Sequence, residues 1–168
     1  MKRYQRSSLE IFLALGLIAL CFTGCATMKT VPKAQLLVIP ESTAVSPTLM
    51  KEPIKFKGLG FAPKEMVVVD ILLPKGMKII GLEEGENSVG IALTTSDELG
   101  NFDAAMEPMA TMQTLLQVPW VQTETGPKPD FKQAKGFPPG VYNIRATGMD
   151  SGLKAKSTLT ILPPPEKK

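Results

Sequence analysis

The side chains of this sequence that could support chemistry are few. The chain has 168 residues and no histidine, which removes the commonest general base and the commonest metal ligand. Zinc sites, histidine-based triads and facial-triad iron sites are therefore not expected. The two cysteines are Cys21 and Cys25, so the rest of the chain has no disulfide and no thiol nucleophile. We predict no catalytic residue, no metal site and no cofactor, and hence a protein that is not an enzyme.

The residues before Cys25 have the pattern of an export signal. The chain begins with three basic residues, Lys2, Arg3 and Arg6, and continues into an uncharged apolar run of 12 residues from Ile11 to Phe22. A membrane-spanning helix needs about 20 apolar residues. The run is too short for that and has the dimensions of the apolar region of a signal peptide.

Phe22-Thr23-Gly24-Cys25 resembles the lipobox of bacterial lipoproteins, in which Leu, a small residue and Gly or Ala precede the cysteine. Phe22 departs from the usual Leu. The resemblance implies a signal peptide at residues 1–24, cleavage before Cys25, and acylation of its sulfur, palmitate included. Two or more acyl chains give stable anchoring, so membrane lipid is the expected partner through Cys25. An ordinary secretory signal or a signal anchor with incidental cysteines is the alternative.

The same family resemblance gives an address. The residue after the cysteine is Ala26, whereas Asp there tends to hold lipoproteins at the inner membrane. The expected location is the cell envelope, lipid-anchored at the outer membrane and facing the periplasm or the exterior. Cleavage would leave 16 basic and 15 acidic residues, because Lys2, Arg3, Arg6 and Glu10 are removed, and Arg145 would be the only arginine. Without a basic patch rich in arginine, nucleic-acid binding is not expected.

The mature chain divides into a tether at 25–34, a folded unit at 35–162 and a Pro/Lys tail at 163–168. Fifteen prolines and 14 glycines favour short strands over long helices. Residues 42–53 indicate irregular or edge structure, and 107–116 indicate a short helix, followed by a long connection at 119–139. Strands are predicted at 35–39, 54–57, 66–73, 77–82, 88–95, 141–146 and 155–161. The last two should form a hairpin through the turn at 148–152.

The predicted fold is all-β: an immunoglobulin-like antiparallel β-sandwich of about seven strands, with one short helical insertion, preceded by a signal peptide. Three segments resemble bacterial immunoglobulin-like modules of exported proteins. They are Gly58–Glu65 (GLGFAPKE), Asp97–Phe102 (DELGNF), and Pro139–Ala146 (PGVYNIRA) followed by Ser151-Gly152. The resemblance covers about residues 54–162, and the helix and the 119–139 connection depart from it. Tyr142 is expected to return its hydroxyl to nearby backbone, as in a tyrosine corner.

Several polar residues were weighed as candidate sites. Asp97, Glu98, Asn101 and Asp103 fall in one turn, where calcium is conceivable, although their spacing does not match an EF-hand loop and a polar hairpin turn is favoured. Glu83, Glu84 and Glu86 are interpreted as a solvated loop. Asp70 lies in the most apolar strand, where a functional buried carboxylate is weighed against an edge position or pairing with a lysine.

Aromatic residues of the connection are the candidate ligand or partner contacts: Trp120, Phe131 and Phe137. The alternative for Trp120 is that it caps the core, and Met106, Met109 and Met112 are expected to fill core space under the helix. The leading hypothesis is a non-catalytic interaction or structural module of the envelope, which contacts a protein or glycan. A second is a carbohydrate- or peptidoglycan-binding lipoprotein using residues 117–139, and a third is a carboxylate-based hydrolase. The sequence predicts no oligomeric state.

Overall fold

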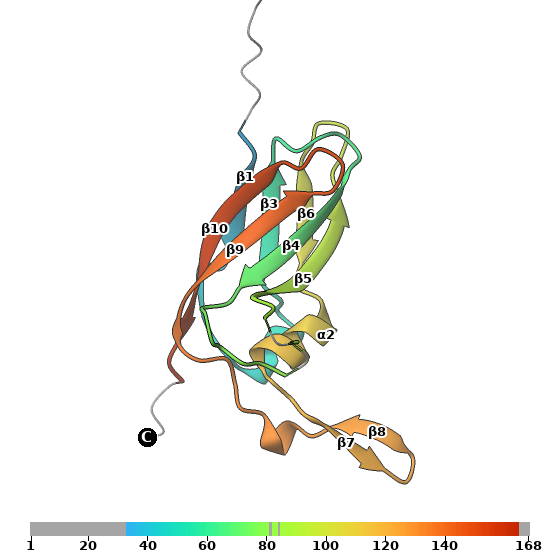
Figure 1. Cartoon of the computed structure of the whole chain (residues 1–168), viewed down its shortest axis with the longest axis vertical. Coiled ribbons are helices and arrows are strands. Elements are labelled where there is room, and N and C mark those ends of the chain that lie inside the picture. Colours follow the sequence, from blue (N-terminus) through green and yellow to red (C-terminus); the bar gives the residue numbers. More distant parts are fainter. Residues whose placement is uncertain (1–32, 81, 84, 165–168) are drawn as a thin grey trace, which may run out of the picture. The chain divides into compact units, whose positions relative to one another are not determined.

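The computed structural model describes residues 33–80, 82–83 and 85–164 (Figure 1). Pro32–Lys168 form one compact unit by their contacts, separate from Met1–Val31. This unit is mostly β, as predicted. Its described helical segments are short: η2 (Pro47–Met50), α2 (Pro108–Ala110), η3 (Thr111–Leu115) and η4 (Phe131–Gln133). None of the helices in the described residues is long and apolar enough to cross a membrane.

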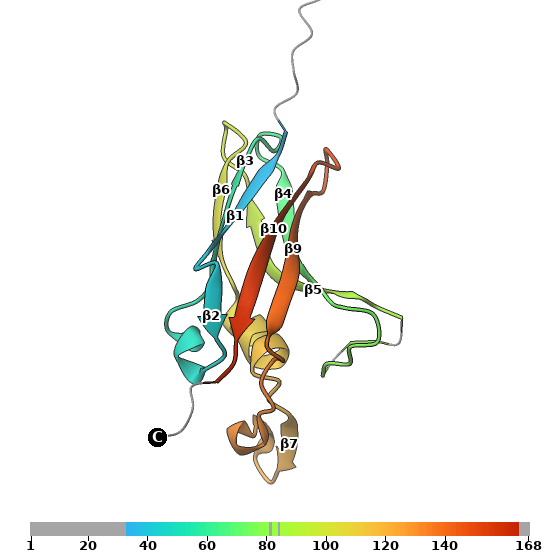
Figure 2. The same cartoon turned by 90° about the vertical axis from the view of Figure 1, so that its left-hand side faces the viewer.

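Two sheets make up the body of this unit (Figures 1 and 2). The larger sheet has the strand order β2-β10-β9-β4-β5 and the smaller one has the order β1-β3-β6. The strands of the larger sheet are β2 (Ser42–Ala44), β4 (Met66–Leu72), β5 (Ser88–Thr95), β9 (Gly140–Gly148) and β10 (Lys154–Leu162). Those of the smaller sheet are β1 (Gln35–Ile39), β3 (Lys55–Leu59) and β6 (Phe102–Ala105). The prediction that 66–73 is a central strand is confirmed, because β4 pairs with both β9 and β5.

The expectation of a purely antiparallel arrangement is wrong at one edge. β1 pairs antiparallel with β3 in the smaller sheet, and after residues 40 and 41 the chain continues as β2 in the larger one. There β2 runs parallel to the end of β10, with Ser42 opposite Thr160. Residues 42–53 thus supply an edge strand and the 3-10 helix η2, as their composition indicated. One segment of chain therefore follows β10 along its length and contributes to both sheets.

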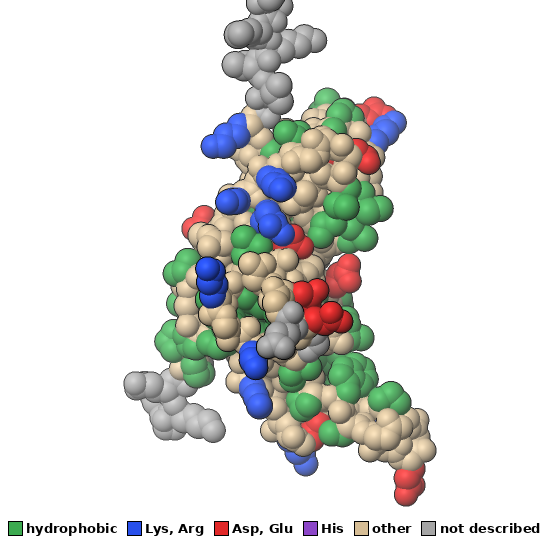
Figure 3. Space-filling model, viewed as in Figure 1, with side chains coloured by type: hydrophobic (Ala, Val, Ile, Leu, Met, Phe, Trp, Pro, Cys, Tyr) green, Lys and Arg blue, Asp and Glu red, His purple; other side chains and the backbone are tan. Residues whose placement is uncertain are grey.

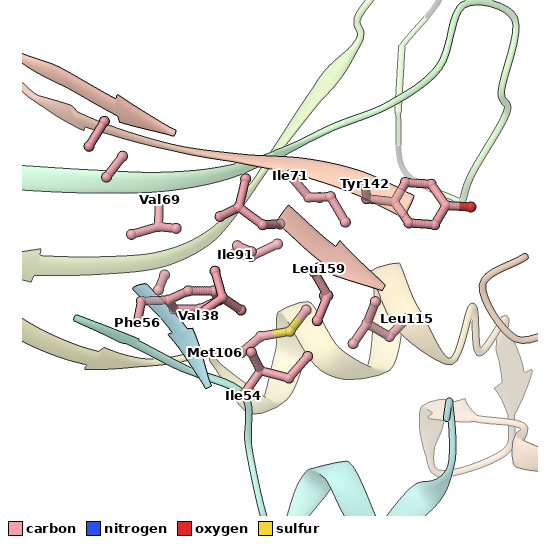
Figure 4. Packing of buried hydrophobic residues seen from close by; sticks show 14 of the residues in the cluster. Val38, Ile54, Phe56, Val69, Ile71, Ile91, Met106, Leu115, Tyr142 and Leu159 are labelled. Atoms are coloured by element: carbon pink, nitrogen blue, oxygen red, sulfur yellow. The ribbon is translucent and has the colours of Figure 1, made fainter. Parts of the chain in front are cut away.

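The core lies between the two sheets and is built from their alternating apolar positions (Figure 4). Phe56 and Val38 come from the smaller sheet, and Val69, Ile144 and Leu159 from the larger one; each is at most 1% exposed. The predicted β9–β10 hairpin is confirmed, with Tyr142 opposite Leu159 and both inward. Burial of apolar side chains contributes roughly 1.5–3 kcal/mol each, so these alternating positions fix which face of each strand is internal.

The strand predicted at 77–82 is wrong. The described residues of this segment belong to a loop between β4 and β5 (Figure 2). The amide of Leu73 donates to the carbonyl of Asn87 at 2.8 Å, so the two ends of the loop are already paired with each other. Met77 donates to Pro74 and Leu82 donates to Ile79 in successive turns. Because β4 pairs directly with β5, the loop that joins them adds no strand between them.

Strict alternation over 88–95 predicts that Val89, Ile91 and Leu93 share one face, and this prediction is wrong for Leu93. A bulge in β5 puts Val69 opposite Ala92 and Asp70 opposite Gly90, so Ile91 is an extra residue. Ile91 and Ala92 are both buried, whereas Leu93 is 55% exposed. A bulge shifts the alternation by one residue. Val89, Ile91 and Leu93 therefore do not share one buried face.

The short helix predicted at 107–116 is confirmed at 108–115 by α2 and η3, the latter being a π-helical turn. Met106 and Met112 are buried as expected, but Met109 is 48% exposed and does not fill the core. The 119–139 connection contains a hairpin that the sequence did not predict, β7 (Trp120–Thr123) with β8 (Gly126–Pro129). In Figure 1 this hairpin extends away from the two sheets.

Candidate functional sites

Cys25, the predicted lipidation site, lies outside the described residues, as do the signal peptide and most of the tether. The described chain begins at Lys33, immediately before β1. It starts at the end of the domain where β3 leads into β4, β5 into β6 and β9 into β10 (Figure 1). This end is called the entry end, and the opposite end, which carries the β7–β8 hairpin, is called the insertion end.

Glu65 is the best-buried charged side chain of the entry end, with 1% exposure. Its Oε1 accepts hydrogen bonds from the amide of Ala62 at 2.6 Å and from the Ser151 hydroxyl at 2.9 Å. Its Oε2 accepts from the amide of Ser151 at 3.0 Å. The carboxylate thereby joins the turn before β4 to the β9–β10 turn. Gly148 makes room for it, because a Cβ there would lie 2.4 Å from Oε1.

Burial alone would raise the pKa of the Glu65 carboxyl, and burial is the largest single influence on it. The hydrogen bonds from Ser151 and Ala62 together outweigh that influence and lower the pKa below its ordinary value of 4.5. The group is therefore an anion whose oxygens are occupied by protein donors. This makes it a structural junction in the described fold. In the sequence Glu65 is one residue of the GLGFAPKE segment and is not predicted as a site, and the only signal for its role is that this segment occurs together with Ser151-Gly152.

A second set of contacts ties the same turn to the β5–β6 turn. The Ser96 hydroxyl donates to the carbonyl of Ala62 at 2.6 Å, and the amide of Phe61 donates to the carbonyl of Gly100 at 3.0 Å. Gly100 has φ +77°, and a Cβ there would lie 2.0 Å from the carbonyl oxygen of Phe61. The Phe61 and Phe102 rings pack 5.3 Å apart. The segments that resemble immunoglobulin-like modules thus meet at the entry end through hydrogen bonds to backbone atoms and through close packing.

The acidic residues weighed as a calcium site are engaged in other interactions. Asp97 Oδ1 accepts from the amides of Leu99 and Asn101, both at 2.8 Å, and its pKa is lowered chiefly by the bond from Asn101. Two ion pairs hold the others: Glu98 with Lys64 at 3.0 Å and Asp103 with Lys57 at 3.1 Å. Within the described residues, no group of three or more acidic side chains is placed to hold a metal ion. The favoured interpretation, a polar hairpin turn, describes this geometry.

Asp70 lies on the outer face of the larger sheet and pairs with Arg145. The Arg145 Nη2 is 2.7 Å from Asp70 Oδ2, and Nε is 3.3 Å from the same oxygen. The two residues are cross-strand partners on β4 and β9, and the side chains are 15% and 30% exposed. The sequence offered pairing with a lysine as an alternative for Asp70, and the partner is instead Arg145. The β4–β5 loop holds Glu83 and Glu86, and Glu84 lies outside the described residues.

Tyr142 makes the hydrogen bond expected of a tyrosine corner. Its hydroxyl donates to the carbonyl of Pro138 at 2.8 Å, four residues upstream. The Phe137 and Tyr142 rings are 4.5 Å apart, and both side chains are buried. Desolvation raises the pKa of the Tyr142 phenol. Phe137 thus packs with the core at the start of β9.

The structure brings two of the three candidate aromatic contacts together. Phe131 and Phe137 line a groove of about 530 Å³ at the insertion end, with Leu116, Lys135, Pro138 and Leu162 among its other walls. Phe131 is 49% exposed, whereas Phe137 is only 4% exposed. Trp120 is 43% exposed and does not line this groove. The alternative in which Trp120 caps the core does not fit that exposure.

Backbone bonds hold the insertion at its base. The amide of Phe137 donates to the carbonyl of Leu115 at 2.7 Å, and that of Gly136 donates to Leu116 at 3.2 Å. Gln117 has φ +46°, and its side-chain amide donates to the carbonyl of Gly136 at 3.2 Å. These bonds close the 117–136 segment onto the end of η3. The groove therefore rests on a fixed base although the hairpin extends beyond it.

Comparisons with known proteins place the chain in no family. A scan against protein-family models found no match, and a search of the curated proteins found none. Among solved structures, the chain is similar to macromomycin, with TM-score 0.39 and 14% identity over 77% of this chain and 99% of that one. It is also similar to BslA, a bacterial hydrophobin, with TM-score 0.36 and 14% identity over 81% and 98% of the two chains. Likenesses at these TM-scores carry no argument about function.

Proposed function

We propose that this protein is an exported lipoprotein, anchored to a membrane through acyl chains on Cys25, whose folded unit is a non-catalytic interaction or structural module of the cell envelope. The observation that carries the proposal is the order of features at the N-terminus: basic residues, a 12-residue apolar run, and Phe22-Thr23-Gly24-Cys25. Stable anchoring then follows from two or more acyl chains. The first strand begins at Gln35, ten residues after Cys25.

We infer an immunoglobulin-like sandwich for the folded unit. The sheet orders β2-β10-β9-β4-β5 and β1-β3-β6 support this assignment, since immunoglobulin sandwiches divide their strands in a comparable way. The Tyr142 bond to Pro138 supports it as well, because a tyrosine near the start of strand F returns its hydroxyl to backbone upstream. Such sandwiches commonly serve as rigid supports for interacting loops.

A non-catalytic role is supported by what the polar side chains do. Glu65 and Asp97 accept backbone hydrogen bonds, and Asp70 pairs with Arg145. Each of these groups serves to hold the fold together. The proposed location is the outer membrane, facing the periplasm or exterior, on the basis of Ala26 after the cysteine. The proposed partner is an envelope protein or glycan.

Mass spectrometry of the mature N-terminus tests the anchoring. The expected result is a chain that begins at Cys25 and carries acyl chains, and a Cys25→Ser variant that is no longer acylated and no longer fractionates with membranes washed at high salt. Cys21→Ser is the matched control, because it removes a cysteine from the signal region while leaving Cys25, and it should leave acylation unchanged. An unmodified Cys25, or retention of residues 1–24, refutes the proposal.

A second candidate function is carbohydrate or peptidoglycan binding by residues 117–139. It is favoured by the groove at the insertion end, which has a half-exposed aromatic ring at Phe131 and a lysine at Lys135. Sugars stack on exposed aromatic rings, and a few polar groups then orient them. Co-sedimentation with insoluble peptidoglycan should fall at least tenfold for Phe131→Ala. Leu99→Ala is the control because Leu99 is 80% exposed at the other end of the domain. Equal binding by parent and Phe131→Ala refutes this candidate.

A further inference from the structure

Three lysines gather around one hollow at the entry end. Lys33 precedes β1, and Lys154 and Lys156 are at the start of β10. All three line an open hollow of about 620 Å³ together with Gln35 and Leu36. We propose that this lysine hollow is a docking surface for the phosphate groups of anionic phospholipids, and that it holds the entry end of the domain against the membrane. This inference rests on the proposed function, because it assumes that the chain is anchored upstream of Lys33.

The charges of the hollow are not neutralised by the ion pairs that the described residues form. Those pairs involve Lys57, Lys64 and Arg145, so none of them uses a lysine of the hollow. Arg145 is the cross-strand partner of Lys156, but its guanidinium forms an ion pair with Asp70. Of the acidic groups at the β9–β10 turn, Glu65 is buried and engaged by Ala62 and Ser151. Asp150 is exposed there and takes part in none of the ion pairs of the described residues. In Figure 3, blue side chains gather over β9 and β10 towards the entry end.

The position of the hollow along the chain fits this partner. Eight peptide units separate Cys25 from Lys33, so an extended tether spans at most about 29 Å. Acyl chains on Cys25 would therefore confine Lys33 to within about 29 Å of the lipid headgroups, a distance from which the lysine hollow can reach them. Lys154 and Lys156 lie beside Lys33, because β1 and β2 run along β10 from its start to its end. An anchored chain can thus bring all three ammonium groups to the bilayer surface at once.

The chemistry of lysine suits headgroup phosphates, which it binds as a flexible point charge with three donors. Each lysine near an anionic membrane strengthens binding roughly fivefold, and the effect falls off within about 10 Å at 0.1 M salt. Three lysines should strengthen binding roughly a hundredfold. Arginine, which favours bidentate recognition of a single phosphate, is absent from the hollow. The lysine hollow is accordingly suited to the many headgroup phosphates of a membrane surface rather than to one tightly bound phosphate.

The experiment measures co-sedimentation of the mature chain, residues 25–168 with Cys25→Ser, with vesicles. This chain retains the whole compact unit and its core. Vesicles of phosphatidylcholine alone are compared with vesicles that contain 30% phosphatidylglycerol. We expect binding only to the anionic vesicles, weakened by salt, and a further loss of roughly 25-fold for the double substitution Lys154→Gln/Lys156→Gln. Lys128→Gln/Lys132→Gln is the matched control, because it removes the same charge from the insertion end and should change binding less than twofold.

Several results overturn the inference. One is equal binding to the two kinds of vesicle, and another is an equal loss for the control substitutions. A third is that the double substitution weakens binding to soluble polyphosphate but not binding to vesicles, which would assign the lysines to a soluble polyanion. None of these results depends on acylation, since Cys25 is replaced in every protein compared. Failure of the docking surface is therefore distinguishable from failure of the anchoring, which the mass of the mature N-terminus reports.

Discussion

Glu65 and Gly148 should be energetically coupled, because one occupies the space that the other leaves. Glu65→Ala removes a carboxylate that accepts three hydrogen bonds and leaves the amides of Ala62 and Ser151 without that acceptor. Bonds to charged groups contribute about 1.5–3 kcal/mol each, although not additively, so the loss should be about 3–4 kcal/mol. Gly148→Ala places a Cβ 2.4–2.5 Å from the same carboxylate. Overpacking of this kind costs about 1–3 kcal/mol.

The double variant decides whether this reasoning holds. Alanine at 65 leaves the space empty, so Gly148→Ala should cost little there, and the coupling energy should be about 2 kcal/mol. Urea unfolding of the mature chain, followed by far-ultraviolet circular dichroism, measures all four proteins. Trp120 is a poor reporter because it is 43% exposed outside the core. Strictly additive losses, within about 0.5 kcal/mol, would show that Gly148 is small for another reason.

Three further predictions concern the same fold. Because the folded-state pKa of Glu65 is lowered, its contribution to stability is present above pH 4.5 and is lost as the pH falls through the folded-state pKa. In a series of urea midpoints measured against pH, Glu65→Gln should flatten the slope over that range. An unchanged slope would contradict this prediction. Gly100→Ala should lower the free energy of unfolding by about 3 kcal/mol or more, because φ at Gly100 is +77° and an added Cβ would clash with the backbone of Phe61. A melting temperature within 2 °C of that of the parent would refute this prediction. Tyr142→Phe should cost about 1 kcal/mol by losing the bond to Pro138, as measured by the same urea assay, and a stability equal to that of the parent would refute it.

Alternation of apolar residues predicted most of the strands that line the core. It did not predict β6, in which Phe102 is the only large apolar residue of a four-residue strand. Tyr142, Ile144 and Leu159 are buried as the period of two required, and their neighbours Asn143 and Thr158 face outwards. The same rule failed for β5, where Leu93 is exposed. The bulge at Ile91 is fixed by pairing with β4 and by the bond from the Glu107 amide to the Ile91 carbonyl. Those partners are distant in sequence, so a local pattern does not contain that information.

The hairpin of the insertion was missed for a different reason. β8 contains Pro127 and Pro129, and proline argues against a strand inside a sheet because it lacks an amide hydrogen. β7 and β8 form a two-stranded ribbon in which each strand has a free side. Proline is tolerated there, since the missing donor need not face a partner. Composition therefore indicated a loop where the tertiary context allows a ribbon.

Glu65 shows what a motif can and cannot reveal. Its place in GLGFAPKE suggested a turn before an apolar strand, and β4 does begin at Met66. The function of the carboxylate depends on Ser151, 86 residues away, and on the absence of a side chain at Gly148. Single-sequence reasoning does not place those residues together. Each segment that resembles an immunoglobulin-like module is therefore a weak signal when taken alone, because its structural role depends on contacts with the other segments.

The two ends of the domain are separated enough to act independently. Lys154 lines the lysine hollow and Leu162 lines the aromatic groove, and both belong to β10. Eight residues of strand at about 3.3 Å each put them roughly 26 Å apart. At that distance substitutions without shared partners should have additive effects. A membrane-facing entry end would then leave the groove pointing away from the bilayer. If Lys154→Gln/Lys156→Gln altered peptidoglycan binding, or Phe131→Ala altered vesicle binding, this separation of roles would be wrong.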